Sequence, residues 1–210
     1  MSGERSASSI SKAEPVAGKP SPIRPVAIVL TPGAGASSDH PTLLALDAAL
    51  SAHGIAVLRV DFPYRLARRR APDRPPVLIE AVRRATVDFA EKLGVELNQI
   101  ALGGRSMGGR MCSMAASEGL PTAGLVLISY PLHPPGHPER PRTAHFPAIE
   151  VPCLFVSGDR DPFGSPDELQ AATQMIVGPV THAWLAGGDH GLRRRDETVA
   201  SIVATWLIPD

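Results

Sequence analysis

The feature that most constrains the fold is a serine flanked by glycines at a predicted boundary between a strand and a helix. The stretch Gly104-Arg105-Ser106-Met107-Gly108 matches the pattern G-x-S-x-G and follows the apolar run 100–103. Glycine two residues before and after a serine indicates a bend too tight for larger neighbours. Such a bend exposes the serine hydroxyl beside the N-terminus of the next helix. The pattern predicts a nucleophile, and a glycine-rich turn without chemistry is the alternative.

Short apolar runs alternate with segments of helical periodicity along the chain. The predicted strands cover residues 26–31, 55–62, 100–103, 124–130, 151–158 and 180–187. The predicted helices cover 41–54, 76–93, a segment from about 107, 165–176, and a closing stripe from Val199 to Trp206. This alternation indicates an α/β fold of three layers, with a mostly parallel central sheet of about six strands and helices on both faces. Chemistry in such folds gathers at the carboxyl ends of the strands.

The length and the tail define the domain organisation. The chain has 210 residues, of which 43% are hydrophobic and 20% charged, which suits one core. Residues 1–24 are rich in Ser, Pro, Gly, Lys and Glu and lack the apolar stretch of a signal peptide. We predict a disordered tail over 1–24 and one domain over 25–210. No apolar run approaches the roughly 18 residues of a membrane span, so no membrane association is expected.

Charge and cysteine content limit the binding partners and the cell compartment that the sequence predicts. Lysine plus arginine and aspartate plus glutamate both number 21, so no global charge excess favours nucleic acid. Cys112 and Cys153 lie in apolar surroundings and are expected to be buried free thiols, which fits a cytoplasmic location. Two arginine clusters stand out. The run 193–195 suits an anionic substrate or simple solvation, and the loop 65–74 offers a surface for an acidic protein partner.

A nucleophilic serine needs a base and an acid that orients the base, in the chain order serine, acid, histidine. Asp161 follows the strand 151–158 and is favoured over Asp159, because a few residues of turn swing a carboxylate toward an imidazole. Asp159 is expected to stabilise that turn, and Asp189 is a third candidate for the acid. His190 lies on a glycine-flanked turn after the last strand and is the predicted base.

The other histidines have simpler interpretations. His182 lies inside a strand, and His40 and His53 flank the first helix, where capping or exposure explains them. A metal-binding set in the proline-rich segment would consist of His133, His137 and His145. Intervening prolines and the lack of nearby carboxylate or thiol ligands argue against that set, and no metal or other cofactor is predicted.

Two backbone N–H groups are expected to form an oxyanion hole. One belongs to Met107, directly after the serine, and the other to Ala34 in the loop TPGAGA, where glycines allow close approach. A phosphate-binding loop is the alternative for that segment, although it lacks a G-K-[ST] ending. The residues expected to line the substrate pocket are Tyr64, Arg65, His133, His145 and Phe146.

Six segments in order carry a family resemblance: TPGAGA, DFPYR, GGRSMGGR, SYPLHPPG, SGDRDPFG and GGDHGL. From about Val26 to Leu207 the chain resembles α/β-hydrolases. More closely, it resembles the small group related to dienelactone hydrolases, which includes testis-expressed hydrolase-like proteins and the hydrolase-like domain of an NSL acetyltransferase-complex subunit. The resemblance implies an α/β-hydrolase fold without the earliest strands, and a triad of Ser106, Asp161 and His190.

This chain also departs from its relatives. Dienelactone hydrolases have cysteine at the bend where this chain has serine, so their substrate does not carry over. Many relatives begin the oxyanion loop with His-Gly, whereas this chain has Pro32-Gly33. Only the proline-rich segment 131–150 is available where many α/β-hydrolases insert a helical cap, so no cap domain is expected.

Together these features predict a serine hydrolase that forms an acyl-enzyme on a small ester, thioester or related acyl substrate, of carboxylesterase-like or dienelactone-hydrolase-like type. The alternative is a non-catalytic binding or scaffold protein that has kept the fold, because some members of the resembled group are complex subunits.

Overall fold

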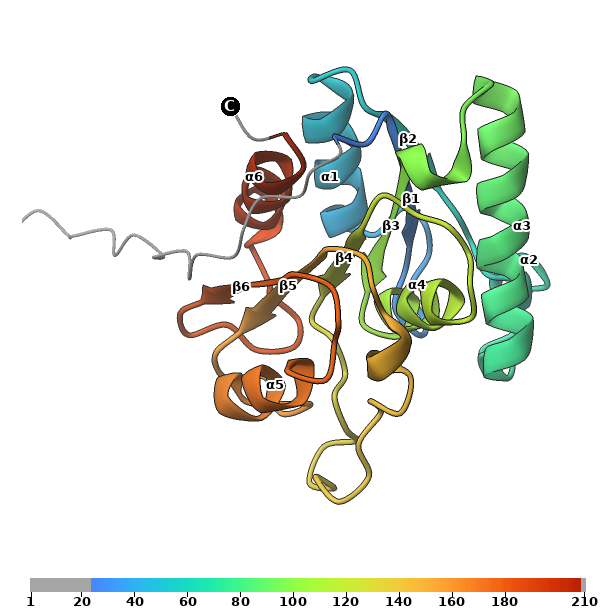
Figure 1. Cartoon of the computed structure of the whole chain (residues 1–210). Coiled ribbons are helices and arrows are strands. Elements are labelled where there is room, and N and C mark those ends of the chain that lie inside the picture. Colours follow the sequence, from blue (N-terminus) through green and yellow to red (C-terminus); the bar gives the residue numbers. More distant parts are fainter. Residues whose placement is uncertain (1–23, 209–210) are drawn as a thin grey trace, which may run out of the picture.

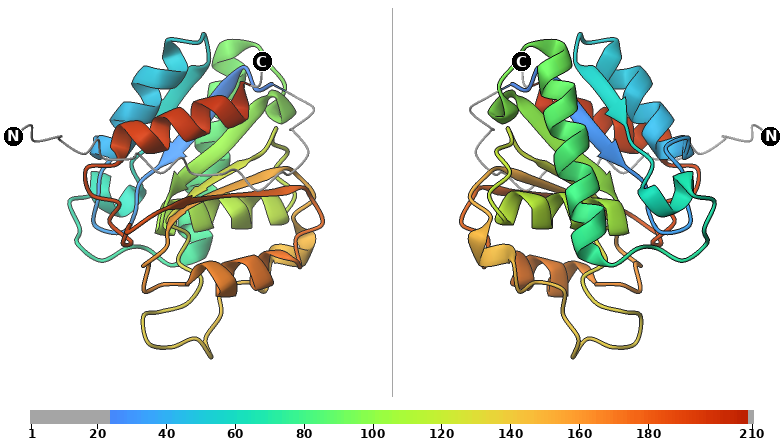
Figure 2. Two further views of the ribbon diagram at one scale, coloured as in Figure 1. Left: turned by 90° about the vertical axis from the view of Figure 1, so that its left-hand side faces the viewer. Right: turned by 90° about the vertical axis from the view of Figure 1, so that its right-hand side faces the viewer.

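A six-stranded sheet forms the centre of the protein (Figures 1 and 2). The computed structural model describes residues 24–208, so residues 1–23 of the predicted tail lie outside the described part. The strands are β1 (Ala27–Thr31), β2 (Ala56–Arg59), β3 (Ile100–Arg105), β4 (Leu125–Ile128), β5 (Cys153–Gly158) and β6 (Val180–Leu185). They lie in the order β2-β1-β3-β4-β5-β6, and every neighbouring pair is parallel. The predicted parallel sheet is confirmed.

Helices cover both faces of the sheet, which gives the three layers visible in Figure 2. One face packs against α1 (Pro41–Ser51) and α6 (Asp196–Leu207). The other face packs against α3 (Pro75–Leu93), α4 (Met107–Ser117) and α5 (Pro166–Thr173). All five residues of β1 are buried, as the unbroken apolar run predicts for a strand covered on both faces.

Local sequence signals account for most helix boundaries. Ser165 caps α5 in a capping box with Glu168, and Gly94 ends α3 in the left-handed conformation. The buried face of this helix ends at Ala90, and Leu93 is the last helical residue, 38% exposed.

The strand predicted over 55–62 is shorter than expected, because β2 ends at Arg59. Asp61 leaves the sheet and accepts hydrogen bonds from the backbone N–H and the hydroxyl of Ser38, both at 2.8 Å. The short helix α2 (Pro63–Leu66) follows and was not predicted. Two turns of 3-10 helix, η1 (Leu97–Gln99) and η2 (Phe146–Ala148), were also missed, since a three-residue element has no periodicity to detect.

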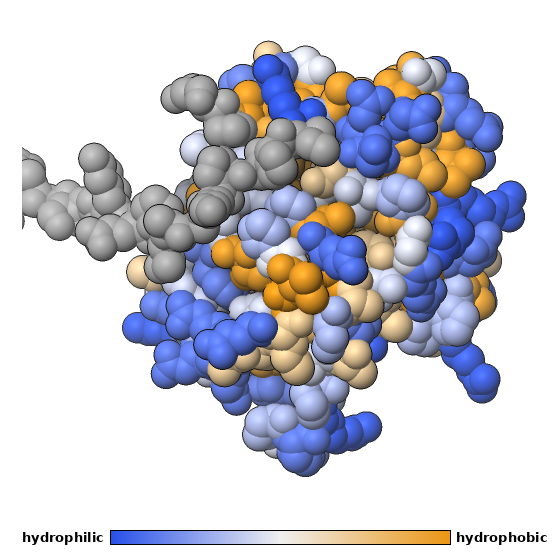
Figure 3. Space-filling model, viewed as in Figure 1, coloured by the Kyte–Doolittle hydropathy of each residue, from blue (hydrophilic) through white to orange (hydrophobic). Residues whose placement is uncertain are grey.

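The connection between β4 and β5 is a long irregular segment, as its prolines predict. Residues 129–152 are all described and contain only the helix η2. This segment forms the projection at the bottom of Figure 1, and the same projection is largely hydrophilic in Figure 3. Between residues 24 and 208, no helix is both long enough and apolar enough to span a membrane.

Both cysteines are buried free thiols, as predicted. The Cys112 thiol lies in α4 against β3 and donates to the Gly103 carbonyl at 3.3 Å. Burial raises the pKa of Cys112 to about 12, so this thiol remains protonated and unreactive at neutral pH.

Two histidines are held neutral by burial. The His182 ring stacks between Phe155 and Trp184, with centroids 5.4 Å and 5.1 Å away, and its Nε2 lies 3.0 Å from the Thr173 hydroxyl. His145 Nε2 lies 2.8 Å from the Ser113 hydroxyl. Desolvation lowers the pKa of each ring from 6.5 to about 4, and the charge of Arg110 adds to the effect at His145.

These shifted values predict acid sensitivity. Between pH 6.5 and pH 4 the unfolded chain binds protons at His145 and His182 that the folded protein does not, so the free energy of unfolding should fall as the pH falls through this window. His182→Gln should weaken this dependence, measured as the difference between urea unfolding midpoints at pH 7 and pH 5. The exposed residue His53, changed to Gln, is the control. Equal pH dependence in all three proteins would contradict the assignment.

Candidate active site

Ser106 occupies a strained bend between β3 and α4. Its φ and ψ are 51° and −117°, a conformation that residues with a side chain rarely adopt. The neighbouring glycines are required by space. A Cβ on Gly104 would lie 2.7 Å from the Thr31 carbonyl oxygen, and one on Gly108 would lie 2.5 Å from the Pro32 carbonyl oxygen. The structure therefore confirms the steric requirement predicted from the glycine pattern.

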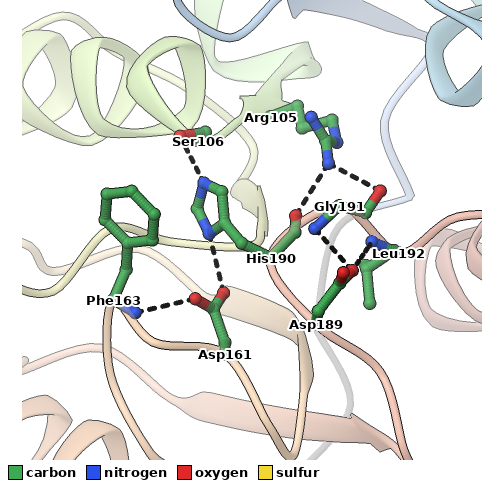
Figure 4. Close-up of polar contacts among 8 residues, drawn as sticks. All are labelled: Arg105, Ser106, Asp161, Phe163, Asp189, His190, Gly191 and Leu192. Carbon is green, nitrogen blue, oxygen red and sulfur yellow. Dashed lines mark hydrogen bonds and ion pairs between the residues drawn. The ribbon is translucent and has the colours of Figure 1, made fainter. Parts of the chain in front are cut away.

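Three polar side chains form a hydrogen-bonded series at the carboxyl edge of the sheet (Figure 4). His190 Nε2 lies 2.8 Å from Ser106 Oγ, and His190 Nδ1 lies 2.8 Å from Asp161 Oδ2. Ser106 follows β3, Asp161 follows β5 and His190 follows β6, so three separate loops supply the series.

The chemistry of the series fixes the direction of its hydrogen bonds. An ionised carboxylate only accepts, so His190 Nδ1 must donate to Asp161. His190 Nε2 is then the acceptor, and it can take the proton of the Ser106 hydroxyl. The Asp161 side chain is only 2% exposed, and its second oxygen accepts from the Phe163 N–H at 2.9 Å.

The two other candidate acids bond elsewhere. Asp159 accepts from the Gly187 N–H at 2.7 Å and thus links the β5 and β6 loops, whereas the sequence predicted a role within its own turn. Asp189 accepts from the N–H groups of Gly191 and Leu192 at 2.8 Å and 3.1 Å and shapes the turn that carries His190. Both carboxylates thus accept hydrogen bonds from backbone N–H groups of the loop after β6.

Two residues that support His190 were missed from the sequence. The Arg105 guanidinium donates to the carbonyls of His190 and Gly191, each at 2.7 Å (Figure 4). The Phe163 ring stacks on the imidazole, with centroids 4.0 Å apart. Arg105 lies inside the G-x-S-x-G pattern, but the variable position of that pattern carries no signal for a contact with a loop 85 residues away.

The loop after β1 lies beside the serine, as predicted. Within it, the Gly35 N–H donates to the Tyr64 hydroxyl at 3.1 Å, and the Ala36 N–H donates to the Gly33 carbonyl at 3.2 Å. Met107 is the first residue of α4, where backbone N–H groups lack partners within the helix. Ala34 and Met107 both line the cavity that Ser106 faces.

That cavity has a volume of about 500 Å³. Its lining contains both Ser106 and His190 and is rich in cationic side chains. The lining residues are Gly33, Ala34, Ala36, His40, Arg105, Ser106, Met107, Arg110, Pro131, Arg142, Phe163 and His190. His40 also caps α1, which was one of its two predicted roles, because its Nδ1 accepts from the Thr42 N–H at 3.2 Å. Burial and the charge of Arg105 lower the pKa of the His40 imidazole.

The five residues predicted to line the pocket are all outside this lining. Tyr64 and Phe146 are fully buried, since large aromatic side chains at strand ends pack into the core. His145 bonds to Ser113, and His133 Nδ1 bonds to the Pro134 carbonyl at 2.9 Å. Arg65 belongs to α2, and its Nε is buried without a hydrogen-bond partner. The position of a residue near the end of a strand was therefore not enough to predict whether its side chain lines the cavity or packs into the core.

The loop histidines considered for a metal bond to separate groups. His137 Nδ1 lies 3.0 Å from Glu139, while His133 and His145 bond to the partners given above. Within the described range 24–208, no three residues among His, Cys, Asp and Glu are grouped as a metal ion would need.

Comparison with known proteins identifies the class. The sequence model of the alpha/beta hydrolase domain family matches residues 24–206, and the chain belongs to this family. An alpha-beta serine hydrolase homologue from Coxiella burnetii has a similar structure, with a TM-score of 0.71 and 17% identity over 95% of this chain and 98% of that one.

Two other solved structures share the fold at similarly low identity. The dienelactone hydrolase from Anabaena variabilis has a TM-score of 0.71 and 17% identity, covering 93% of this chain and 95% of its own. Est1E from Butyrivibrio proteoclasticus has a TM-score of 0.69 and 19% identity, covering 90% of this chain and 89% of its own. The predicted α/β-hydrolase fold is confirmed.

The bend predicts a sharp difference between two glycine substitutions. Gly108→Ala would place a Cβ 2.5 Å from the Pro32 carbonyl and should lower the free energy of unfolding by about 2 kcal/mol or more. At Gly33 the nearest atoms to a Cβ lie 3.5 Å away, so Gly33→Ala should change stability by less than about 0.5 kcal/mol. Chemical denaturation of both variants tests this contrast. Similar stability of the two would show that the bend has more space than the structure indicates.

Proposed function

We propose that the protein is a serine hydrolase that acts on a small ester or thioester through an acyl-enzyme. The observation that carries this proposal is the hydrogen-bonded series from Ser106 through His190 to the buried Asp161, beside a cavity of about 500 Å³. A serine hydroxyl that lines a cavity and lies 2.8 Å from an imidazole nitrogen is the arrangement that nucleophilic attack requires.

In the first half-reaction, Ser106 Oγ forms a bond to the substrate carbonyl carbon as its proton passes to His190 Nε2. Asp161 stabilises the imidazolium and holds the ring in the tautomer that accepts the proton. When the tetrahedral intermediate collapses, the bond to the leaving group breaks and His190 gives that group the proton. The products are the acyl-enzyme and a free alcohol or thiol.

In the second half-reaction, water replaces the leaving group. His190 Nε2 takes a proton from water as the water oxygen attacks the acyl carbon, and collapse returns this proton to Ser106 Oγ. The Ala34 and Met107 N–H groups are proposed to stabilise the negative oxygen of both intermediates. Loss of one such donor costs about 10²- to 10³-fold in rate in other enzymes.

The order of the sequence motifs also supports membership of the dienelactone-hydrolase-related subgroup. The structural likeness to the Anabaena variabilis enzyme agrees with this placement at the level of the fold. Because Ser106 stands where dienelactone hydrolases have cysteine, we do not infer their substrate for this protein. A fluorophosphonate probe, which reacts with activated serines, is therefore a suitable reagent whatever the natural substrate.

Ser106→Ala should abolish fluorophosphonate labelling and turnover of 4-nitrophenyl acetate while leaving the fold intact. The matched control is Ser113→Ala, which removes a hydroxyl from the same helix, away from His190. Labelling followed by mass spectrometry of the modified peptide locates the reactive group. A folded wild-type protein that does not react would favour a non-catalytic binding protein, and labelling that survives in Ser106→Ala would place the nucleophile elsewhere.

The identity of the acid can be tested with isosteric substitutions. Asp161→Asn should lower kcat by about 10²- to 10⁴-fold, because an amide cannot stabilise the imidazolium that forms at His190. Asp159→Asn retains the oxygen that accepts from Gly187 and should cost less than about 10-fold. Steady-state kinetics on 4-nitrophenyl acetate compare the two variants. The reverse order of effects would assign the acid to Asp159.

A further inference from the structure

The cavity beside Ser106 has a wall of one charge sign. Three arginines contribute to its lining, and the lining contains no aspartate or glutamate. Burying cationic groups together without a counter-charge is unfavourable unless an anion joins them. The charge of this wall therefore favours a ligand that carries a negative charge.

Arg105 is not the unbalanced member of the set. Its guanidinium is held by the carbonyls of His190 and Gly191. Burial lowers its pKa, and the charges of Asp161, Asp189 and Asp196 oppose that shift. Although the Arg105 Nε is buried without a partner, its terminal nitrogen has two carbonyl partners, and negative charge lies nearby. Arg105 therefore serves to position the His190 turn.

Arg110 and Arg142 lack such compensation. The ion pairs found within residues 24–208 involve neither of them, and Arg110 Nε is buried with no hydrogen-bond partner. Both side chains line the Ser106 cavity. Burial lowers the pKa of Arg142, and the charge of Arg110 lowers it further. Two arginines from different elements therefore line one cavity, and their guanidinium groups have N–H donors available to bind a ligand.

Both arginines are held in place by their backbones. Arg110 lies one helical turn after the nucleophile, and its N–H donates to the Ser106 carbonyl at 3.1 Å. Residues four apart lie on the same face of a helix, separated by about 5 to 6 Å. Arg142 is fixed in the β4–β5 segment, where its N–H donates to the Leu132 carbonyl and its carbonyl accepts from the Tyr130 hydroxyl, both at 2.8 Å.

We infer that the acyl substrate carries an anionic group, of the carboxylate type, a few atoms from the scissile carbonyl, and that Arg110 and Arg142 bind this group. The planar guanidinium matches a carboxylate through paired hydrogen bonds, and such charge-assisted contacts are the strong ones. This inference rests on the proposed function, because it names the substrate class of the same site. It also defines how the substrate lies in the Ser106 cavity: the reacting carbonyl is at Ser106, and the anionic group is about one helical turn away.

Matched ester pairs test the inference. The first pair is the 4-nitrophenyl monoester of adipic acid and the methyl ester of that compound, which differ in charge on the acyl side. The second pair is 4-acetoxybenzoate and its methyl ester, which differ in charge on the leaving group. For at least one pair, kcat/KM should be about 10- to 100-fold higher for the anion. No preference for the anion in either pair would overturn the inference.

Arginine variants connect the preference to the two side chains. Arg110→Gln and Arg142→Gln should each lower the ratio of kcat/KM between anionic and neutral ester by about 10-fold or more, and the lysine variants should retain part of it. Arg84→Gln removes the same charge from an exposed position of α3 and should keep the ratio. Because a ratio within one protein is compared, partial misfolding of a variant does not affect it. An equal ratio in all variants would assign the preference to other groups and overturn the role of the arginines.

Fluorophosphonate labelling separates failure of the inference from failure of the proposed function. Labelling of Ser106 together with equal rates for charged and neutral esters would leave the hydrolase proposal intact and overturn only the anionic substrate. A folded protein with no labelling and no turnover of any ester would overturn both.

Discussion

The close contact between the serine bend and the end of β1 is the constraint on which the rest of the site depends. With glycine at positions 104 and 108, the backbone of the bend approaches Thr31 and Pro32 at distances that no Cβ would permit. This contact brings the loop after β1, with Ala34, against the first turn of α4, with Met107. The proposed oxyanion hole and the strained Ser106 are therefore products of one packing arrangement between adjacent parallel strands.

A second close contact joins the loops that carry the acid and the base. A Cβ on Gly158 would lie 2.9 Å from the Cα of Gly188, so the chain after β5 and the chain after β6 touch through backbone alone. Asp159 adds a hydrogen bond to Gly187, and Arg160 donates its N–H to the Gly188 carbonyl at 2.9 Å. Since Asp161 and His190 lie within three residues of these contacts, their separation is set by the backbone.

The order of elements and the three residues of the polar series could be predicted from the sequence, because each left a local signal. Ser106 has flanking glycines, and Asp161 and His190 follow apolar strands in turn-forming segments. The wall of the cavity could not be predicted in this way. Arg142 reaches it from an irregular segment with no periodicity, whereas Tyr64 and Phe146 at similar strand-end positions turn inward. Which way a loop side chain points depends on tertiary packing that adjacent residues do not encode.

Arg105 joins the two ends of the proposed proton path through a single side chain. Its backbone precedes Ser106, and its guanidinium donates to the consecutive carbonyls of His190 and Gly191. These two hydrogen bonds couple the position of the bend to that of the imidazole turn. Such coupling means that the site is already ordered before a ligand binds. Less of the binding free energy is then spent on ordering the two loops, and more of it contributes to affinity or to the reaction rate.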